Sequence, residues 1–195
     1  SDLTTDINGI YFPEILQERE NEVQIRTRPE AGRRNIGPSQ KYWIEKDLVF
    51  PVAKGAKNIG RGQFYPDTNI VCLLPNYGIL ADDYEKASKK LARLPKTEQY
   101  FRDFKELLET RSTYSKFMKG APYWAVYNVG NYTLSQYKVA WAEIGSVVKA
   151  AVLKSDDNPF KLKNLEVIPD HKLYFAAFDN QEEALFLSGL LNSSM

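Results

Sequence analysis

The feature of this sequence that most limits its fold is the shortness of its apolar runs. Residues 67–74 (DTNIVCLL) and 146–153 (SVVKAAVL) are rich in Val, Ile and Leu and are bounded by Gly, Pro, Asn, Ser or Asp. Runs of this length between turn-forming residues are typical of short β-strands. Further strands are expected at residues 41–52 (KYWIEKDLVFPV), 121–129 (APYWAVYNV), 137–144 (YKVAWAEI) and 171–178 (HKLYFAAF).

Three other segments have the spacing of amphipathic helices, at residues 82–94, 97–112 and 179–194. The first follows an N-cap candidate, Asp82, and Pro95 separates it from the second. The third opens with Asn180 and has Glu183 three residues later, which is the spacing of a capping box. The second places five apolar side chains on one face: Tyr100, Phe101, Phe104, Leu107 and Leu108. Together these patterns predict an α+β fold of short twisted β-sheets with a few amphipathic helices.

Composition excludes several classes of protein. A chain of 195 residues that is 43% hydrophobic and 26% charged is ordinary for a globular protein, and we interpret residues 1–195 as one domain. Residues 1–40 are expected to be irregular or weakly strand-forming. The single cysteine, Cys72, can form neither an intrachain disulfide nor a cysteine cluster around zinc. No apolar stretch approaches eighteen residues, so we expect no membrane partner and a cytoplasmic location.

The segment 49–75 combines glycines with cations between two apolar runs. Gly55 and Gly60 have the spacing of a nucleotide-binding P-loop, but Arg61 and Gly62 follow where Lys and Ser or Thr are needed for phosphate and Mg²⁺. A nucleoside triphosphate site is therefore not favoured. A loop held between two strands can instead present Lys54, Lys57 and Arg61 to phosphate groups.

Charge is distributed unevenly along the chain. Residues 1–25 have six acidic side chains against one basic, a balance of −5, and residues 26–62 have nine basic against three acidic, a balance of +6. A basic field of this kind suits a polyanion such as DNA. It also suits a solvated face that the acidic segment neutralises, and the sequence leaves both interpretations open.

Catalytic clusters are scarce. The only histidine, His171, begins a predicted strand, where a structural or exposed role is expected. A metal nuclease using Asp67 and Asp103 is a weak alternative, because Asp103 falls on a predicted helix. Aromatic and basic residues interleave between 123 and 141. We expect Tyr123, Tyr127 and Trp141 in the core and Tyr132, in a turn, at the surface.

The order of four segments resembles a known family. These are residues 44–59 (IEKDLVFPVAKGAKNI), 108–114 (LETRSTY), 137–141 (YKVAW) and 191–193 (LNS). Over about residues 41–194 the chain resembles the TaqI-like C-terminal specificity, or target-recognition, domain of N6-adenine DNA methyltransferases, which also occurs in fused restriction–modification enzymes. The first forty residues match no pattern of that family.

The resemblance implies a non-catalytic fragment of a larger protein. It would recognise a sequence in double-stranded DNA, while a companion methyltransferase domain would bind S-adenosylmethionine and catalyse methyl transfer. The expected DNA contacts, from the loops and the aromatic segment, are Arg33, Arg34, Lys54, Lys57, Arg61, Tyr132 and Lys138. Arg111, at a predicted helix end, is expected to be structural. A protein-interaction scaffold that docks a methyltransferase or nuclease subunit is the alternative from another class.

Overall fold

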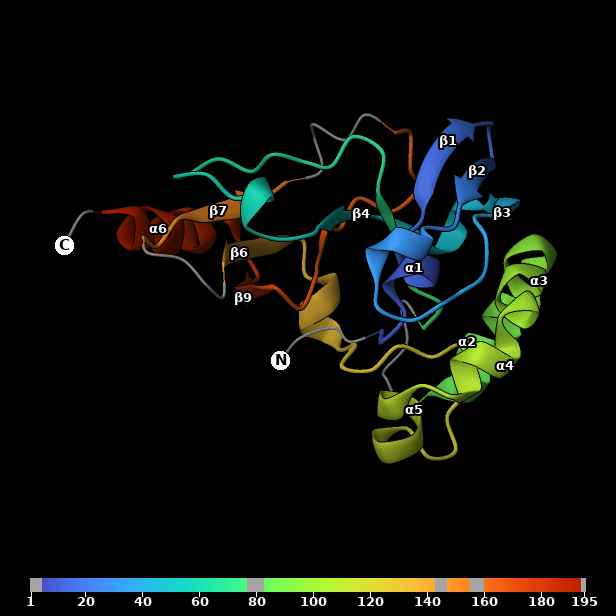
Figure 1. Cartoon of the computed structure of the whole chain (residues 1–195). Helices are drawn as coiled ribbons and strands as arrows, with labels where there is room; N and C mark the ends of the chain where they lie inside the picture. Colours follow the sequence, from blue (N-terminus) through green and yellow to red (C-terminus); the bar gives the residue numbers. More distant parts are fainter. Residues whose placement is uncertain (1–4, 77–82, 143–146, 155–159, 194–195) are drawn as a thin grey trace.

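The computed structural model describes residues 5–76, 83–142, 147–154 and 160–193. Within them the chain forms three small three-stranded sheets and six α-helices, so the predicted α+β fold is confirmed. Figure 1 shows the first sheet and helices α2 to α5 toward one end of the molecule and the third sheet with α6 at the other. The second sheet connects these two ends.

Two strands of the first sheet come from residues 1–40, which were expected to be irregular or weakly strand-forming, and the third comes from the predicted strand segment 41–52. A short helix α1 (Asn8–Tyr11) precedes β1 (Glu14–Glu18), which pairs antiparallel with β2 (Glu22–Arg26), and β2 pairs with β3 (Lys41–Glu45). Ile7, Ile10, Tyr11 and Phe12 are all buried. These N-terminal residues therefore belong to the largest hydrophobic core, whereas the connection from β2 to β3 has only the 3₁₀ turn η1 (Pro29–Ala31).

The second sheet has the order β5, β4, β8. Strand β4 (Val49–Ala53) pairs antiparallel with β5 (Val71–Leu73) and parallel with β8 (Ile168–Pro169). The prediction of one strand over residues 41–52 was wrong, because η2 (Lys46–Leu48) interrupts it. At that turn Lys46 is buried, and its ammonium lies 3.1 Å from Glu18 and donates to the carbonyl of Lys161 at 2.9 Å.

The third sheet has the order β7, β6, β9, all antiparallel: β6 (Tyr137–Ala142) lies between β7 (Ala150–Leu153) and β9 (Leu173–Phe178). Alternate residues of β6 face opposite sides. Val139 packs with the helix α6 (Gln181–Asn192), and Ala140 packs with the opposite layer, which includes Ile59 and Phe64. The predicted N-cap of α6 is confirmed, because Asn180 accepts a hydrogen bond from the amide of Glu183 at 2.9 Å.

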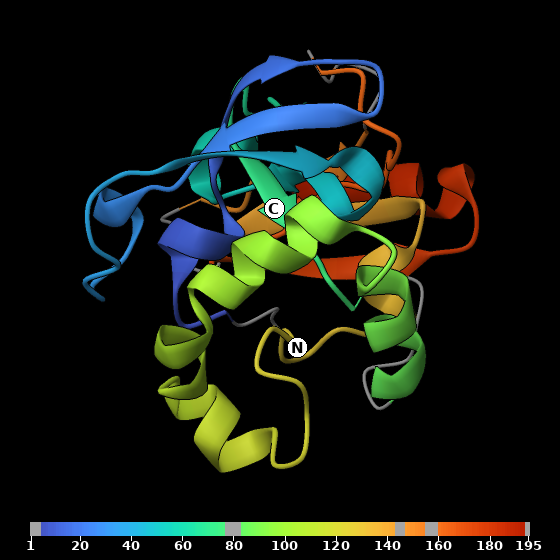
Figure 2. The ribbon, with the colours of Figure 1, turned by 90° about the vertical axis from the view of Figure 1, so that its right-hand side faces the viewer.

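The remaining helices are short: α2 (Tyr84–Leu91), α3 (Pro95–Asp103), α4 (Lys105–Glu109) and α5 (Ser112–Phe117). Figure 2 shows α3 alongside β3, where the rings of Tyr100 and Tyr42 meet edge to face at 4.8 Å. The single helix predicted over residues 97–112 is broken at Phe104, whose ring stays against Tyr100 at 5.4 Å. Asp83 caps α2 by accepting from the amide of Lys86; the predicted cap, Asp82, lies outside the described residues.

Residues 121–129, predicted as a strand, belong to no strand. Their backbone is held by side chains from other parts of the chain instead. The guanidinium of Arg111 donates to the carbonyls of Tyr123 and Ala125, and the amide group of Asn76 both donates to and accepts from the backbone of Val126. These contacts satisfy backbone groups of Tyr123, Ala125 and Val126 that a neighbouring strand would otherwise bind, and only Tyr127 has the pairing of an isolated bridge. Arg111 is 1% exposed, which confirms its structural role.

Two further 3₁₀ helices lie in connections: η3 (Ala56–Asn58) lies between β4 and β5, and η4 (Asn131–Leu134) precedes β6.

No helix among the described residues has the length and apolar character needed to cross a membrane.

Candidate nucleic-acid interface

The glycine–cation loop, defined as residues 54–70, is tied together by one buried asparagine. The side-chain oxygen of Asn58 accepts from the amides of Lys54 (2.8 Å) and Gly55 (3.2 Å). Its side-chain nitrogen donates to the carbonyl of Tyr65 (2.8 Å) and to Asp67 (3.2 Å). These hydrogen bonds fix the backbone of the loop and thereby the positions from which its side chains project.

Several amides of this loop, including those of two glycines, already have partners. Gly60 donates to the carbonyl of Gln63 at 2.8 Å, and Gly62 donates to the carbonyl of Ala150, in β7, at 2.9 Å. Gly62 has φ +70°, a conformation that side chains disfavour. A P-loop needs free amides that surround the phosphates. The geometry thus agrees with the sequence in not favouring a nucleoside triphosphate site.

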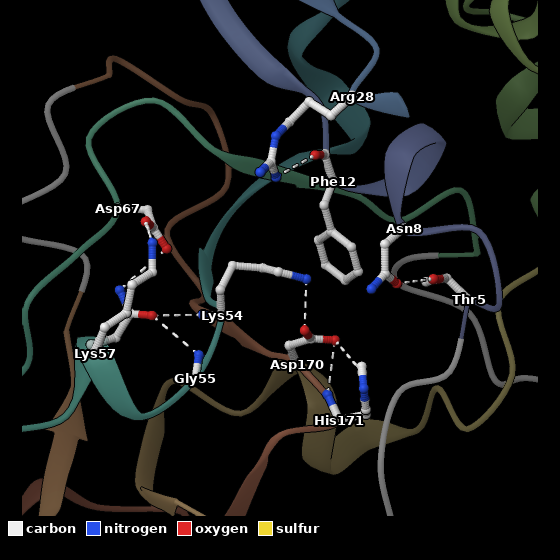
Figure 3. Close-up of polar contacts among 11 residues, drawn as sticks. Thr5, Asn8, Phe12, Arg28, Lys54, Gly55, Lys57, Asp67, Asp170 and His171 are labelled. Atoms are coloured by element: carbon white, nitrogen blue, oxygen red, sulfur yellow. Dashed lines mark hydrogen bonds and ion pairs between the residues drawn. The ribbon is translucent and has the colours of Figure 1, made fainter. Parts of the chain in front are cut away.

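Two of the predicted phosphate contacts in this loop are paired with carboxylates (Figure 3). The Lys54 ammonium lies 2.6 Å from Asp170 and 3.5 Å from the centroid of the Phe12 ring. Lys57 lies 2.6 Å from Asp67 and keeps 65% of its side chain exposed. Lys54 is thus committed to the protein interior, whereas Lys57 remains accessible to a ligand.

Asp170 links Lys54 to the only histidine. Its second carboxylate oxygen lies 2.8 Å from Nδ1 of His171 and also accepts from the His171 backbone amide at 2.9 Å. The hydrogen bond that the ring of His171 donates to Asp170 raises the pKa of His171 above its ordinary value. Burial alone would raise the pKa of Asp170, but His171 and Lys54 together lower it. Burial lowers the pKa of Lys54, and the charge of Asp170 opposes that shift.

His171 opens onto a pocket of about 610 Å³. Its walls come from the N-terminal segment, the turn around η1 and the turn between β8 and β9. The lining residues are Thr5, Asp6, Asn8, Glu30, Ala31, Gly32, Arg33, His171 and Lys172. The fold therefore brings one predicted DNA contact, Arg33, together with two residues that were not predicted, His171 and Lys172.

Arg34 and Arg61 lie elsewhere. The Arg34 guanidinium donates to the hydroxyl and the carbonyl of Thr110, at the end of α4. Arg61 is exposed at the tip of the glycine–cation loop, and the described residues supply it with no hydrogen bond or ion pair. Arg61 is thus a more accessible cation than Arg34.

The two residues predicted from the aromatic segment differ in exposure. Tyr132 is 36% exposed in η4, where its hydroxyl donates to the carbonyl of Asn128 and its ring lies 6.0 Å from that of Phe175. Lys138 is 1% exposed, and its ammonium donates to the carbonyl of Ser135 at 2.5 Å. Burial lowers the pKa of Lys138 to about 8. The structure therefore does not present the Lys138 ammonium to DNA.

Much of the basic segment is neutralised within the molecule. Five of its cations form ion pairs with carboxylates: Arg26 with Glu14, Arg28 with Glu30, Lys46 with Glu18, Lys54 with Asp170 and Lys57 with Asp67. Two of those carboxylates, Glu14 and Glu18, belong to the acidic segment. Internal neutralisation therefore accounts for these five cations, whereas Arg33, Lys41 and Arg61 keep no ion pair within the described part of the chain.

A separate apolar surface lies on α6. Its exposed side chains are Leu185 (49%), Phe186 (74%) and Leu190 (58%). Phe178, Leu187, Phe186 and the acidic pair Glu182 and Glu183 line a hollow of about 470 Å³ beside it. We call the exposed residues Leu185, Phe186 and Leu190 the outer face of α6.

The two carboxylates of the nuclease alternative, Asp67 and Asp103, do not form a metal site in the described part of the chain. Asp67 is paired with Lys57, and Asp103, at the end of α3, accepts from the side chain of Gln99. Among the described residues, no three His, Cys, Asp or Glu side chains are grouped so that they could hold a metal ion.

Comparison with known proteins places these features in a wider context. No protein-family model matches the chain. The chain is 27% identical over 152 residues to the type II methyltransferase M.NspV of Nostoc sp. (strain ATCC 29411 / PCC 7524). The chain is a distant relative of a type II methyltransferase. The match covers 78% of this chain and 29% of M.NspV, so the chain spans less than a third of the length of the curated relative it matches.

Sequence reasoning missed the contacts of Asp170 and His171, although the two are neighbours in the sequence. Their third partner, Lys54, lies 116 residues before Asp170. The adjacent acid and histidine were the only local signal, and such a pair is also common at ordinary strand ends.

Proposed function

We propose that this chain recognises a sequence in double-stranded DNA for an adenine-N6 methyltransferase or a fused restriction–modification enzyme, and that it takes no part in catalysis. The observation that carries the proposal is the partial match to M.NspV, which extends over most of this chain but a minor part of the methyltransferase. A companion region would bind S-adenosylmethionine and transfer the methyl group, in the cytoplasm.

The surface chemistry supports this proposal. Arg33, Arg61 and Lys172 are exposed cations that no described carboxylate pairs with, and Lys57 is largely exposed despite its pairing. Exposed Lys and Arg side chains contact phosphates and make binding depend on salt. Arg33, near a pocket, could also approach a base edge, where Arg is the commonest reader of guanine.

The test is binding of the purified chain to a random duplex pool. We expect weak binding that falls with rising salt and enriches one sequence motif, because only part of the enzyme's DNA contacts are present. Binding that no salt concentration changes, or that enriches no motif even in the full-length enzyme, would contradict the proposal. Methyl transfer by this chain alone would contradict its non-catalytic part.

A second candidate function is docking of a methyltransferase subunit, which the outer face of α6 favours. This face carries large apolar side chains, and Asp179, Glu182 and Glu183 lie at the start of the helix without any Lys or Arg along it. Such a surface repels phosphate, so DNA is a poor occupant. A companion protein surface with apolar residues and a basic rim suits it better.

The substitution Phe186→Ser separates this docking role from folding. Since Phe186 is 74% exposed, we expect the Tm of the isolated chain to stay within about a degree, and the Tm of the full-length enzyme to fall by several degrees. Leu165→Ser, at a site 61% exposed and remote in sequence from α6, is the control and should change neither. Equal Tm values for the wild-type and Phe186→Ser full-length enzymes would remove α6 from the docking surface.

A further inference from the structure

The pocket beside His171 is lined by two cationic side chains that are not paired with other described residues. Arg33 and Lys172 line it and have no hydrogen-bonded or ionic partner among the described residues. The two acids that line it already have partners: Asp6 accepts from the amide of Thr113 at 2.7 Å, and Glu30 pairs with Arg28 at 3.1 Å. An incoming anion would therefore meet more free positive than negative charge.

The orientation of the His171 ring is fixed by Asp170, which contacts its Nδ1. An ionised carboxylate only accepts hydrogen bonds, so contact with Asp170 at 2.8 Å requires the proton on Nδ1. Asp170 is itself held in place, because its side chain is 1% exposed and its other oxygen binds Lys54 at 2.6 Å. The remaining ring nitrogen, Nε2, has no partner among the described residues. Figure 3 shows this chain of contacts from Phe12 and Lys54 through Asp170 to His171.

The protonation state of His171 decides what Nε2 can bind. With Nδ1 protonated, Nε2 is an acceptor in the neutral ring and a donor in the imidazolium. Asp170 favours the imidazolium, whereas Lys54 and Lys172 oppose it. Arg33 also opposes it from across the pocket, and Asp6 and Glu30 favour it. An anion in the pocket would add to the forces that keep the ring protonated.

We propose that this pocket binds a backbone phosphate of the DNA, with Arg33, Lys172 and the Nε2 of protonated His171 as donors. The inference rests on the proposed function and adds a site to it. Apart from His171, none of the described residues that line the pocket is aromatic, so they offer a nucleobase little to stack against. The consequence is a DNA affinity that falls as pH rises through the pKa of His171.

The experiment follows the ring of His171 by NMR during pH titrations of the full chain, with and without a duplex. Because the protein has one histidine, its ring signals need no assignment by mutation. Binding of phosphate to the imidazolium should raise the pKa of His171 on addition of duplex. A contact worth tenfold in affinity corresponds to a rise of about one unit.

Affinity measurements with variants complete the test at constant ionic strength. We expect wild-type affinity to fall roughly tenfold between pH 5.5 and 8.5 and the variant His171→Gln to lose this step. Arg33→Ala should bind more weakly at every pH and lower the salt slope by about one. Lys41→Ala removes an exposed cation on β3, outside the pocket lining, and should keep the full pH step.

The outcomes separate this inference from the proposed function. If wild type binds the duplex but the pKa of His171 does not move and His171→Gln keeps the pH step, the pocket inference is overturned and DNA recognition stands. If wild type binds no duplex, the proposed function fails and the inference fails with it. A second titration replaces the duplex with inorganic phosphate at the same concentration of phosphate groups. If inorganic phosphate raises the pKa of His171 as much as the duplex does, the pocket binds free phosphate and the DNA assignment is overturned.

Discussion

At the scale of single residues, two of the buried cations, Arg111 and Lys138, are satisfied to different degrees. The guanidinium of Arg111 donates to four backbone carbonyls, those of Thr5, Leu108, Tyr123 and Ala125. Among the described residues, the ammonium of Lys138 has one hydrogen bond, to Ser135; burial lowers its pKa to about 8, and the charge of Glu166 only partly opposes this shift. A buried charge with few partners is costly, so Lys138 should reduce stability wherever it is protonated in the folded state.

The pH dependence of stability tests this difference. The pKa of Lys138 is 10.5 when unfolded and about 8 when folded, so between these values the unfolded chain binds more protons and the free energy of unfolding rises with pH. The rise is on the order of 3 kcal/mol for this shift. Lys138→Met should abolish it and be the more stable protein at pH 7. Denaturant unfolding at pH 7 and pH 10 measures it, with Lys41→Met as the exposed control; equal pH dependence in wild type and Lys138→Met would refute the assignment.

At the scale of elements, the glycine–cation loop is an ordered connection between β4 and β5. Asn58 makes four hydrogen bonds within it, and Ile59 and Phe64 are buried against the third sheet. The side chain of Asn58 therefore connects the two ends of the loop, Lys54 and Gly55 on one side and Tyr65 and Asp67 on the other.

Removal of that side chain should release the loop. Asn58→Ala leaves the buried amides of Lys54 and Gly55 without their acceptor, and we expect a loss of about 2–4 kcal/mol in the free energy of unfolding. Hydrogen exchange at these two amides should accelerate. Asn69→Ala, which removes one exposed hydrogen bond to Glu14, should cost under about 1 kcal/mol. Unchanged exchange in Asn58→Ala would mean that the loop is held by other contacts.

At the scale of the whole molecule, the fold separates two kinds of surface. The third sheet packs against α6 on one side and against the glycine–cation loop on the other. The outer face of α6 is apolar, and acidic residues lie at the start of the helix. Figure 1 shows α6 at the far end of the molecule from the first sheet. A protein partner on α6 and a duplex near the loop could therefore bind at the same time.

A substitution of Arg61 in the full-length enzyme tests the proposed contact of the glycine–cation loop with DNA. Phosphates are the same beside every base pair, so Arg61→Ala should weaken binding to all sequences alike and lower the salt slope by about one, without changing the recognised motif. Lys119→Ala, an exposed lysine beyond α5, is the control and should leave the slope unchanged. A change of motif in Arg61→Ala would assign Arg61 to base reading, and an unchanged slope would remove it from the interface.

The sequence by itself determined those features that depend on neighbouring residues. The strands β6, β7 and β9, the N-cap of α6 and the α+β character all follow from local periodicity and from turn residues a few positions away. The structural role of Arg111 was also foreseen. The resemblance to a methyltransferase specificity domain agrees with a distant and partial match to one type II methyltransferase, and no finer assignment of the family follows from that match.

Only the tertiary structure decided which polar groups meet. Lys54 and Asp170 are 116 residues apart, and Asn76 and Val126 are 50 apart, so no local pattern could indicate that Lys54 is paired or that residues 121–129 form no strand. Lys138 lies in a strand that was predicted, yet it is 1% exposed, and that burial depends on residues packed around β6 from distant parts of the chain. The free energy of a charged side chain is set by what surrounds it in space. This is why three cations predicted alike as DNA contacts, Lys54, Lys138 and Arg33, are an interior ion pair, a buried ammonium and part of the lining of the His171 pocket.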